Sequence, residues 1–388
     1  MTTLRSLRLR ANVVVLFATL GLTQIRCARA ENSATFKYQD YAELGGRMTV
    51  KVMSTLIEQD LSSDLHLKLQ GVTDAIAGAT PSGDLPAAPG ADVPLSEMHD
   101  HRKAWNAELA KQFPRINVSL GASESREHDY VSDGASVNTL TDFNEKNTTL
   151  LLGIAGNNDR VKVFYQGPYV SKTARDAIIG VTQLLSPLTV VSLDFSYNLT
   201  KGYLNDPYRL IQKSTQIVPG VFLPLTYPEN RPDQRSNWTV FAGLNHAVPA
   251  AAGAVEANYR LYHDTFGTTA HTLELKWLQK IGQQLVLTPL VRYYQQTAAN
   301  FYRVSLDGTS IVPGFLPKPT GPFYSADYRL AKLLTWGYGM EAVWNTPLNW
   351  LRLDVAWERY DMQGRDGFTP TSYYPRANIT TLGVKISW

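Results

Sequence analysis

The sequence has almost no cysteine and no long apolar run. Its one cysteine, Cys27, falls in an N-terminal segment with the features of a cleaved leader, so the remaining chain has no disulfides and no thiolate metal sites. After that segment no run of eighteen apolar residues occurs, which excludes membrane-spanning helices. The mean hydropathy is only −0.20, although 44% of the residues are hydrophobic. These figures are typical of a chain in which apolar and polar residues are finely interleaved.

Residues 1–30 have the pattern of a secretory signal peptide. Three arginines lie between residues 5 and 10, an apolar run covers Val13 to Leu22, and Ala28 to Ala30 forms a small-x-small cleavage site. Arg26 stands where a lipoprotein signal needs a small residue, which argues against a lipid anchor on Cys27. We therefore expect export, cleavage after residue 30 and a single domain over residues 31–388.

The apparent basicity of the chain belongs to this leader. The full sequence has 37 basic and 34 acidic residues, and removing the five leader arginines leaves 32 basic residues and a net charge of −2. A chain with that balance lacks the basic surface that nucleic-acid binding requires. We expect no nucleic-acid partner.

The last twelve residues alternate between apolar and polar side chains. Leu382, Val384, Ile386 and Trp388 fall on one parity, and the residues between them, such as Lys385, fall on the other. This is the period of a β-strand with one apolar face. In a strand that faces lipid, a terminal tryptophan would join an aromatic girdle. We therefore predict that these four apolar residues face outer-membrane lipid and form the signal recognised by the barrel-assembly machinery.

The same alternation recurs along the chain and predicts sixteen strands. The predicted strands are Thr35 to Leu44, Met48 to Gln59, Asp64 to Ile76, Arg102 to Lys111, Ile116 to Tyr130, Val131 to Leu140, Thr148 to Asn157, Ala174 to Leu185, Leu188 to Lys201, Trp238 to Ala247, Val255 to Thr265, His271 to Lys280, Gln284 to Thr297, Arg329 to Trp344, Trp350 to Tyr360 and Ala377 to Trp388. The segment Arg102 to Lys111 also fits a helical turn. Four long loops rich in Pro, Gly or Tyr separate some of the pairs: Ala77 to Leu95, Gly202 to Arg235, Ala299 to Tyr328 and Asp361 to Pro375.

The connections between predicted strands alternate between short turns and a set that includes every long loop. Short periplasmic turns and long extracellular loops are the pattern of an outer-membrane barrel, which needs an even number of strands when both ends lie in the periplasm. A secreted β-sandwich or propeller also explains local alternation, but it does not explain long loops on one side. We predict an all-β, transmembrane antiparallel barrel of about 16 strands in the outer membrane of a Gram-negative bacterium.

Several short motifs, in this order, resemble a Gram-negative family of unknown function, domain of unknown function 3570. The motifs are Tyr38 to Tyr41, Asp74 to Pro81, Glu127 to Tyr130, Asn144 to Thr149, Val181 to Ser186 and Gly202 to Arg209. Ala77 stands where this pattern has a serine. The resemblance covers nearly all of the chain after the leader. It implies an outer-membrane barrel, and it brings no activity, cofactor or catalytic residue with it.

If the apolar parity faces lipid, the opposite parity places charges of both signs inside. The predicted pore-lining residues are Lys68, Arg102, Glu108, Glu256, Arg260, Asp264, Glu274, Lys276, Arg292, Glu341, Arg352, Asp354, Glu358 and Lys385. A barrel of about 16 strands is wide enough for an aqueous channel. Each single charge is explained equally well by pairing with a neighbouring strand. Together they favour a porin-like passive channel for small hydrophilic solutes.

Two other function classes fit the sequence less well. A metal site at His99 and His101 lacks a third ligand, so we expect no metal. His128, flanked by acids, could act on Ser123 or Ser125 in an outer-membrane lipid hydrolase or acyltransferase, but no Gly-x-Ser-x-Gly elbow is present. We therefore predict no catalytic residues and no cofactor.

The third class is a non-conducting barrel that displays its loops for adhesion or a partner. Aromatic residues in these loops, which either stack sugars or pack the loops together, are Tyr208, Tyr227, Tyr302, Phe323 and Tyr324.

Overall fold

Sixteen antiparallel strands close into one barrel. The computed structural model describes residues 32–88, 90–163, 167 and 169–388, so the predicted signal peptide lies outside the described residues. The barrel order follows the chain, and β1 pairs with β18 to close the sheet. The barrel strands are β1 (Ser33–Glu43), β2 (Met48–Ser62), β3 (Leu65–Pro81), β4 (Leu95–Gln112), β5 (Ile116–Arg126), β6 (Tyr130–Phe143), β7 (Thr148–Lys162), β8 (Tyr169–Ser186), β9 (Thr189–Gly202), β12 (Gln234–Val248), β13 (Gly253–Asp264), β14 (Thr269–Ile281), β15 (Leu285–Gln296), β16 (Leu333–Asn345), β17 (Leu351–Gly364) and β18 (Arg376–Ser387).

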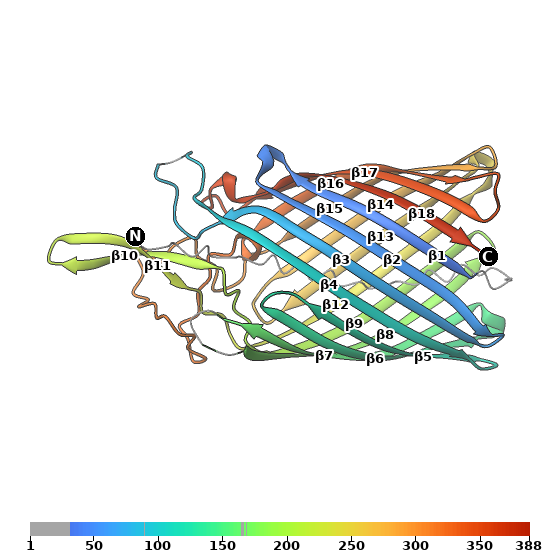
Figure 1. Ribbon diagram of the computed structural model, residues 1–388, viewed down its shortest axis with the longest axis horizontal. Coiled ribbons are helices and arrows are strands. Elements are labelled where there is room, and N and C mark those ends of the chain that lie inside the picture. Colours follow the sequence, from blue (N-terminus) through green and yellow to red (C-terminus); the bar gives the residue numbers. More distant parts are fainter. Residues whose placement is uncertain (1–31, 89, 164–166, 168) are drawn as a thin grey trace.

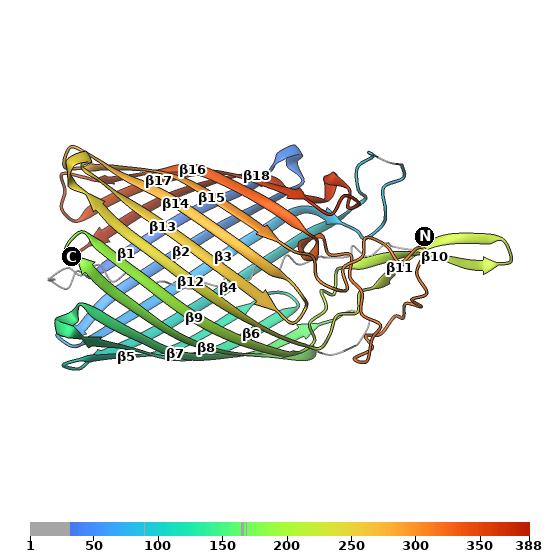
Figure 2. The ribbon, with the colours of Figure 1, turned by 180° about the vertical axis from the view of Figure 1, so that it is seen from behind.

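The two ends of the barrel differ, as Figure 1 shows. The element bounds give seven short turns at the end that holds Trp388, which is the periplasmic end. The other end holds the long loops and a separate two-stranded sheet made of β10 (Leu210–Val218) and β11 (Val221–Pro228). This hairpin projects away from the barrel roughly along its axis in both Figure 1 and Figure 2. Five single-turn 3-10 helices complete the described structure: η1 (Leu44–Gly46), η2 (Asn144–Lys146), η3 (Pro249–Ala251), η4 (Tyr328–Leu330) and η5 (Thr371–Tyr373).

The apolar parity of the strands forms the outside of the barrel. Large apolar side chains such as Phe195 on β9, Leu275 on β14 and Val355 on β17 are exposed, and the residues between them are more covered. A bilayer requires both an apolar outer surface and a closed sheet. The sheet must close because hydrocarbon offers no hydrogen-bond partner to a free strand edge. Leu382, Val384, Ile386 and Trp388 belong to this outer row.

The first strand pairs with the last strand to close the barrel. Ser33 lies opposite Ser387 and Glu43 lies opposite Ala377, so β1 and β18 pair over their whole length. The Trp388 amide also donates a hydrogen bond to the Asn32 carbonyl, at 2.9 Å. The predicted sixteen-stranded outer-membrane barrel is confirmed.

The structure corrects several of the predicted strand and loop boundaries. The loop predicted from Ala77 to Leu95 is shorter, because β3 and β4 stay paired from Leu65 opposite Lys111 up to Pro81 opposite Leu95. Arg102 to Lys111 is accordingly part of a strand and not a helical turn. The loop from Gly202 to Arg235 contains the β10–β11 hairpin, which the sequence did not predict. Among the described residues no helix is both long and apolar enough to cross a bilayer.

Candidate functional site: the barrel wall and the loop cap

The predicted pore-lining residues all lie on strand positions that alternate with the exposed apolar row. Lys68 and Glu108 are register partners on β3 and β4. The others are Arg102 on β4, Glu256, Arg260 and Asp264 on β13, Glu274 and Lys276 on β14, Arg292 on β15, Glu341 on β16, Arg352, Asp354 and Glu358 on β17, and Lys385 on β18. Most of them therefore gather on the arc from β13 to β18, which we call the charged wall. Their role in lining a conducting path stays a prediction.

Neighbouring charges on this wall are close enough to pair. Lys276 Nζ lies 3.1 Å from Glu256 Oε1 and 3.2 Å from Glu274 Oε1. Arg292 is the register partner of Glu274, which extends the alternation of sign to β15. Lys37 of β1 lies 3.4 Å from the Asp354 carboxylate. Such pairs of opposite charge stabilise a sheet only slightly.

The opposite arc, from β5 to β9, carries small and mostly uncharged inward residues, and we call it the small wall. Its inward positions include Ser119, Gly121, Ser123, Gly134, Ser136, Asn138, Gly153, Ala155, Asn157, Gly180, Ser192, Ser196 and Asn198. Two glycines here lie close to inward side chains of neighbouring strands: a Cβ on Gly180 would stand 2.1 Å from Asp194 Oδ1, and one on Gly153 would stand 2.3 Å from Asn138 Oδ1, so a larger residue would have to displace those side chains. The sequence shows this wall as frequent Gly, Ser and Asn on one parity, a signal that a search for charged residues overlooks.

The extracellular loops pack together into a loop cap. We define it as the described residues of 82–94, 203–233, 265–268, 297–332 and 365–375. Its segments reach across the barrel mouth: Arg209 Nη1 donates to the Pro81 carbonyl (3.4 Å), and the Leu85 amide donates to Gln212 Oε1 (3.0 Å). Five strands, β4 to β8, separate β3 from β9, from which the loop with Arg209 starts. The longest loops are therefore a structured element over the barrel opening.

A hydrophobic core holds the loop cap together. Val93, Phe266, Phe301, Tyr328 and Tyr373 are buried in one cluster although they come from four different loops. The Phe266 and Phe301 rings meet edge to face with centroids 4.9 Å apart. Apolar burial of this kind orders loops that lack regular hydrogen-bonded ladders. The predicted loop aromatics Tyr227, Tyr302 and Tyr324 are also buried, and Tyr208 packs beside Met48 and Met98. They pack the loops together, and no exposed aromatic track is formed by them.

A cluster of six charged side chains lies next to this core, where the Arg209 guanidinium stands 5.3 Å from the centre of the Tyr328 ring. It contains Asp206, Arg209, Glu229, Arg231, Asp327 and Arg329. The Asp327 carboxylate accepts from Arg231 at 2.9 Å and from Arg329 at 2.6 Å, and Arg329 also reaches Asp206 at 2.7 Å. Because Arg231 and Asp206 belong to loop 203–233 and Asp327 to loop 297–332, the cluster ties the two longest loops together.

The acids of the cluster experience opposite electrostatic effects. Burial alone would raise the pKa of Asp327, but the guanidiniums of Arg329, Arg209 and Arg231 hold that pKa well below its usual range. Burial raises the pKa of Glu229 to about 7, against the lowering effect of Arg231. Glu229 also accepts from Ser325 Oγ at 2.5 Å. Sequence reasoning missed this cluster, because its three local pairs, Asp206 with Arg209, Glu229 with Arg231 and Asp327 with Arg329, are not all close to one another in the chain.

The histidine motifs do not assemble a reactive centre. Asp100 of β4 and Glu127 and Asp129 of the turn between β5 and β6 bring carboxylate oxygens within 4.8 Å of one another. Within the described residues, neither His99 nor His101 belongs to this group. His128 is exposed and forms no hydrogen bond with Ser123 or Ser125 in the described part of the chain. The geometry therefore gives no support to a hydrolase built on these residues.

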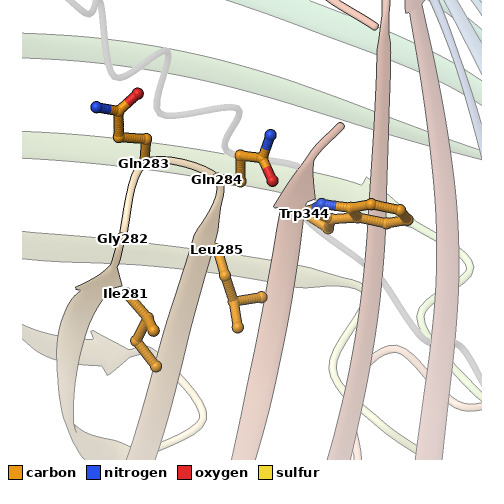
Figure 3. Close-up of a pocket in the computed structure, with 6 residues that line it drawn as sticks. All are labelled: Ile281, Gly282, Gln283, Gln284, Leu285 and Trp344. Atoms are coloured by element: carbon orange, nitrogen blue, oxygen red, sulfur yellow. The ribbon is translucent and has the colours of Figure 1, made fainter. Parts of the chain in front are cut away.

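An open hollow of about 690 Å³ lies beside the periplasmic turn between β14 and β15. Figure 3 shows its lining, which includes Ile281 and Leu285 on either side of the turn and Trp344 on the neighbouring strand β16. Ile281 and Trp344 are exposed on the outer, lipid-facing row. The hollow therefore belongs to the periplasmic girdle of the barrel and not to its interior.

Comparison with known families gives one match. The model of the family described as "Protein of unknown function (DUF3570)" matches residues 87–174 and 166–373, which is well over half of the chain. A comparison with curated proteins found no match.

Many solved structures resemble the barrel, at low sequence identity. They include a loop-deletion mutant of the outer-membrane protein OmpT of Vibrio cholerae, with 10% identity, TM-score 0.44, 93% of this chain and 100% of that chain covered. CdiB from Acinetobacter baumannii has 9% identity and TM-score 0.48, with 93% and 60% covered. The CymD monoaromatic hydrocarbon channel has 9% identity and TM-score 0.42, with 93% and 89% covered. Likeness at this level carries no argument about what the present chain binds or transports.

Proposed function

The chain is a member of the DUF3570 family of proteins of unknown function, and we propose that this outer-membrane barrel is a porin-like passive channel for small hydrophilic solutes. One observation carries the proposal. The inward parity is polar over most of the circumference, with charges of both signs on the charged wall and Gly, Ser and Asn on the small wall. A polar lining suits a water-filled path, and a barrel of about 16 strands is wide enough for one.

The loop cap supplies the constriction in this proposal. Loop 203–233 crosses the mouth from β9 to Pro81, and the charge cluster fixes it to loop 297–332. A rigid cap would admit solutes only through the gaps between its loops. The charged wall below would then bias the sign of the ions that pass, because charges in a narrow path are weakly screened.

Single-channel recording in planar bilayers tests the channel. The purified protein should give stepwise conductance. Replacing residues 205–231 by a short Gly-Ser linker should raise the size of each step, because the mouth opens. Its matched control replaces only residues 217–222 by Gly-Ser; these lie in the projecting hairpin, so the step should keep its size. Folded, heat-modifiable protein that leaves the bilayer silent, in both parent and linker variant, would refute the proposal.

The charged wall offers a second readout in the same recordings. Arg292→Gln removes one positive charge from the inward face of β15 and should shift the permeability ratio toward cations. Ser196→Gln on the small wall is the neutral control and should leave that ratio unchanged. An Arg292→Gln channel with the parent's ion preference would show that the charged wall does not contact the permeating ions.

A further inference from the structure

Two loops of the cap carry the same apolar motif. The first copy runs Ile217-Val218-Pro219-Gly220-Val221-Phe222-Leu223-Pro224 and forms the end of the β10–β11 hairpin. The second runs Ile311-Val312-Pro313-Gly314-Phe315-Leu316-Pro317 in loop 297–332 and differs chiefly by lacking one residue after the glycine. We call them the hairpin tip and the loop tip. Neither contains a charged residue.

Both tips present large apolar side chains to solvent. Phe222 of the hairpin tip is 59% exposed, and Phe315 of the loop tip is 67% exposed. Other exposed members are Ile217, Val218, Val221 and Leu223 in the hairpin tip and Val312 and Leu316 in the loop tip. Clustered exposed apolar surface on the water-facing end of a protein marks an interaction site.

The two tips are fixed to each other at their bases. The Leu306 amide donates to the Gln212 carbonyl at 2.9 Å, and Lys213 Nζ donates to the Thr309 carbonyl at 3.0 Å. The Phe315 ring also lies against Tyr227 of β11, with centroids 5.4 Å apart. The protein therefore holds both copies on one structured support, with the loop tip seated against the base of the hairpin.

The exposure of the hairpin tip indicates what covers it. Residues 216–225 are exposed on both faces of the two-stranded sheet. A hairpin that binds in the groove of a partner protein is expected to have one apolar face, which contacts the groove, and one polar face, which stays in water. The hairpin points away from the barrel's own membrane along the barrel axis (Figure 1, Figure 2). Pro224 within β11 removes a backbone donor from the free edge, which disfavours addition of another strand.

We propose that the hairpin tip and the loop tip insert into the surface of a second bilayer that faces the outer membrane from outside. A bilayer surrounds an inserted tip on all sides, which matches apolar exposure on both faces. The uncharged motifs bury their side chains at the boundary of headgroups and acyl chains, and hydrogen bonds between β10 and β11 satisfy much of the inserted backbone. This activity is independent of conduction through the barrel.

Flotation with vesicles tests the proposal. The full chain in nanodiscs is mixed with phosphatidylcholine vesicles and separated on a density gradient. The parent protein should float with the vesicles at low and at high salt, because the contact involves no charge. Phe222→Asp and Phe315→Asp together should lower the ratio of vesicle-bound to free protein by about a hundredfold, since burial of each Phe in lipid raises that ratio about tenfold.

A matched variant and a second measurement complete the test. Phe368→Asp changes an exposed Phe in another loop of the same cap, and it should float like the parent. Phe222→Trp in nanodiscs of ordinary lipid should lose fluorescence when the added vesicles contain brominated lipid, which reports insertion of the tip. Parent protein that stays at the bottom of the gradient, flotation that disappears at high salt, or equal flotation of the Phe222→Asp, Phe315→Asp double variant and the Phe368→Asp variant would each overturn the proposal.

Discussion

The barrel wall and the loop cap of this protein follow opposite burial rules. On the wall, apolar residues such as Leu193 point outward and charges such as Lys276 point inward. In the loop cap, Phe301 and Leu330 are buried at the centre, as in a water-soluble domain. The difference follows from the solvent: hydrocarbon surrounds the wall, whereas water surrounds the cap. One chain therefore contains an outer-membrane structure and a small globular structure built on top of it.

The two regions also treat charge differently. Wall charges such as Lys276 keep partial exposure and pair with Glu256 on the adjacent strand and with Glu274 on the same strand. In the cap, Asp206, Glu229 and Asp327 are almost fully buried and depend on guanidiniums from distant parts of the sequence. Removing one member of a buried ion cluster leaves another charge buried without a partner and costs much stability. Removing one member of a partly solvated pair costs little, because water solvates the charge that remains. The cap should therefore be the region more sensitive to single charge changes.

The largest expected effect comes from Asp327→Asn. This change keeps the shape of the side chain and leaves Arg231, Arg329 and Arg209 without their shared counter-charge, so the cap should lose about 3–5 kcal/mol of stability. Trypsin should then cut loops 203–233 and 297–332, while the barrel keeps its heat-modifiable mobility on gels. Asp92→Asn, an exposed change in the same cap, is the control. Equal resistance of both variants would show that the cluster does not hold the cap together.

The next effect separates the outside of the wall from its inside. Leu193→Arg places a charge on the lipid-facing row of β9 and should cost about 2–4 kcal/mol if the site lies near the middle of the bilayer. Ser196→Arg, three residues along the same strand, points into the barrel and should assemble normally. Urea titration of the protein folded into lipid vesicles measures both. Equal losses for the two variants would contradict the assignment of the faces.

The wall could be predicted from the sequence because the alternation of apolar and polar residues identifies each strand separately. Alternation along Val191 to Leu199 is visible without knowledge of any partner, and lipid makes the rule strict. The rule fails where both faces are apolar. On β2, Val50 packs inward against Met48 and Met98 while Lys51 lies on the exposed row. Nothing within that segment alone separates the two faces.

The loop cap could not be predicted, because its order comes from contacts between distant residues. Arg231 and Asp327 are separated by 96 positions, and proximity of that kind has no local pattern. The β10–β11 hairpin was missed for another reason. Its tip holds two prolines and a glycine, which predict a loop, and apolar residues stand on both parities instead of one. The sequence therefore lacks the alternation that identified the barrel strands.

A smaller effect links the cap to pH through Glu229. Its pKa of about 7 in the folded cap lies above its ordinary value of 4.5, so this group's contribution to stability is complete below the ordinary value and is lost as the pH rises through about 7. The slope is at most about 1.4 kcal/mol per pH unit, for one proton. Trypsin cleavage of the cap, normalised to cleavage of an unfolded peptide, should therefore accelerate between about pH 5 and pH 8.

Glu229→Gln is the control for this pH dependence. The amide cannot titrate, so the normalised cleavage rate of this variant should be flat over the same interval. The other charges that face Glu229, namely Arg231, Asp206 and Asp327, remain in place. A parent cap whose cleavage slows as the pH rises would show that the guanidinium of Arg231 outweighs burial at this carboxyl.

The smallest effect concerns the end of the wall farthest from the cap. Deleting Trp388 removes an exposed aromatic from the periplasmic girdle and the hydrogen bond from its amide to Asn32, at 2.9 Å. The loss of stability should be about 1–2 kcal/mol, because the side chain is only partly buried in lipid.

We predict a larger effect on assembly, since the terminal row of Leu382, Val384, Ile386 and Trp388 is our proposed signal to the barrel-assembly machinery. The truncated chain should fold more slowly than the parent in vesicles that contain this machinery, and at nearly the parent's rate in vesicles of pure lipid. Trp388→Phe should restore the rate, and trypsin resistance of the cap should match the parent throughout. Normal machinery-assisted folding of the truncated chain would show that Trp388 acts only as a girdle residue.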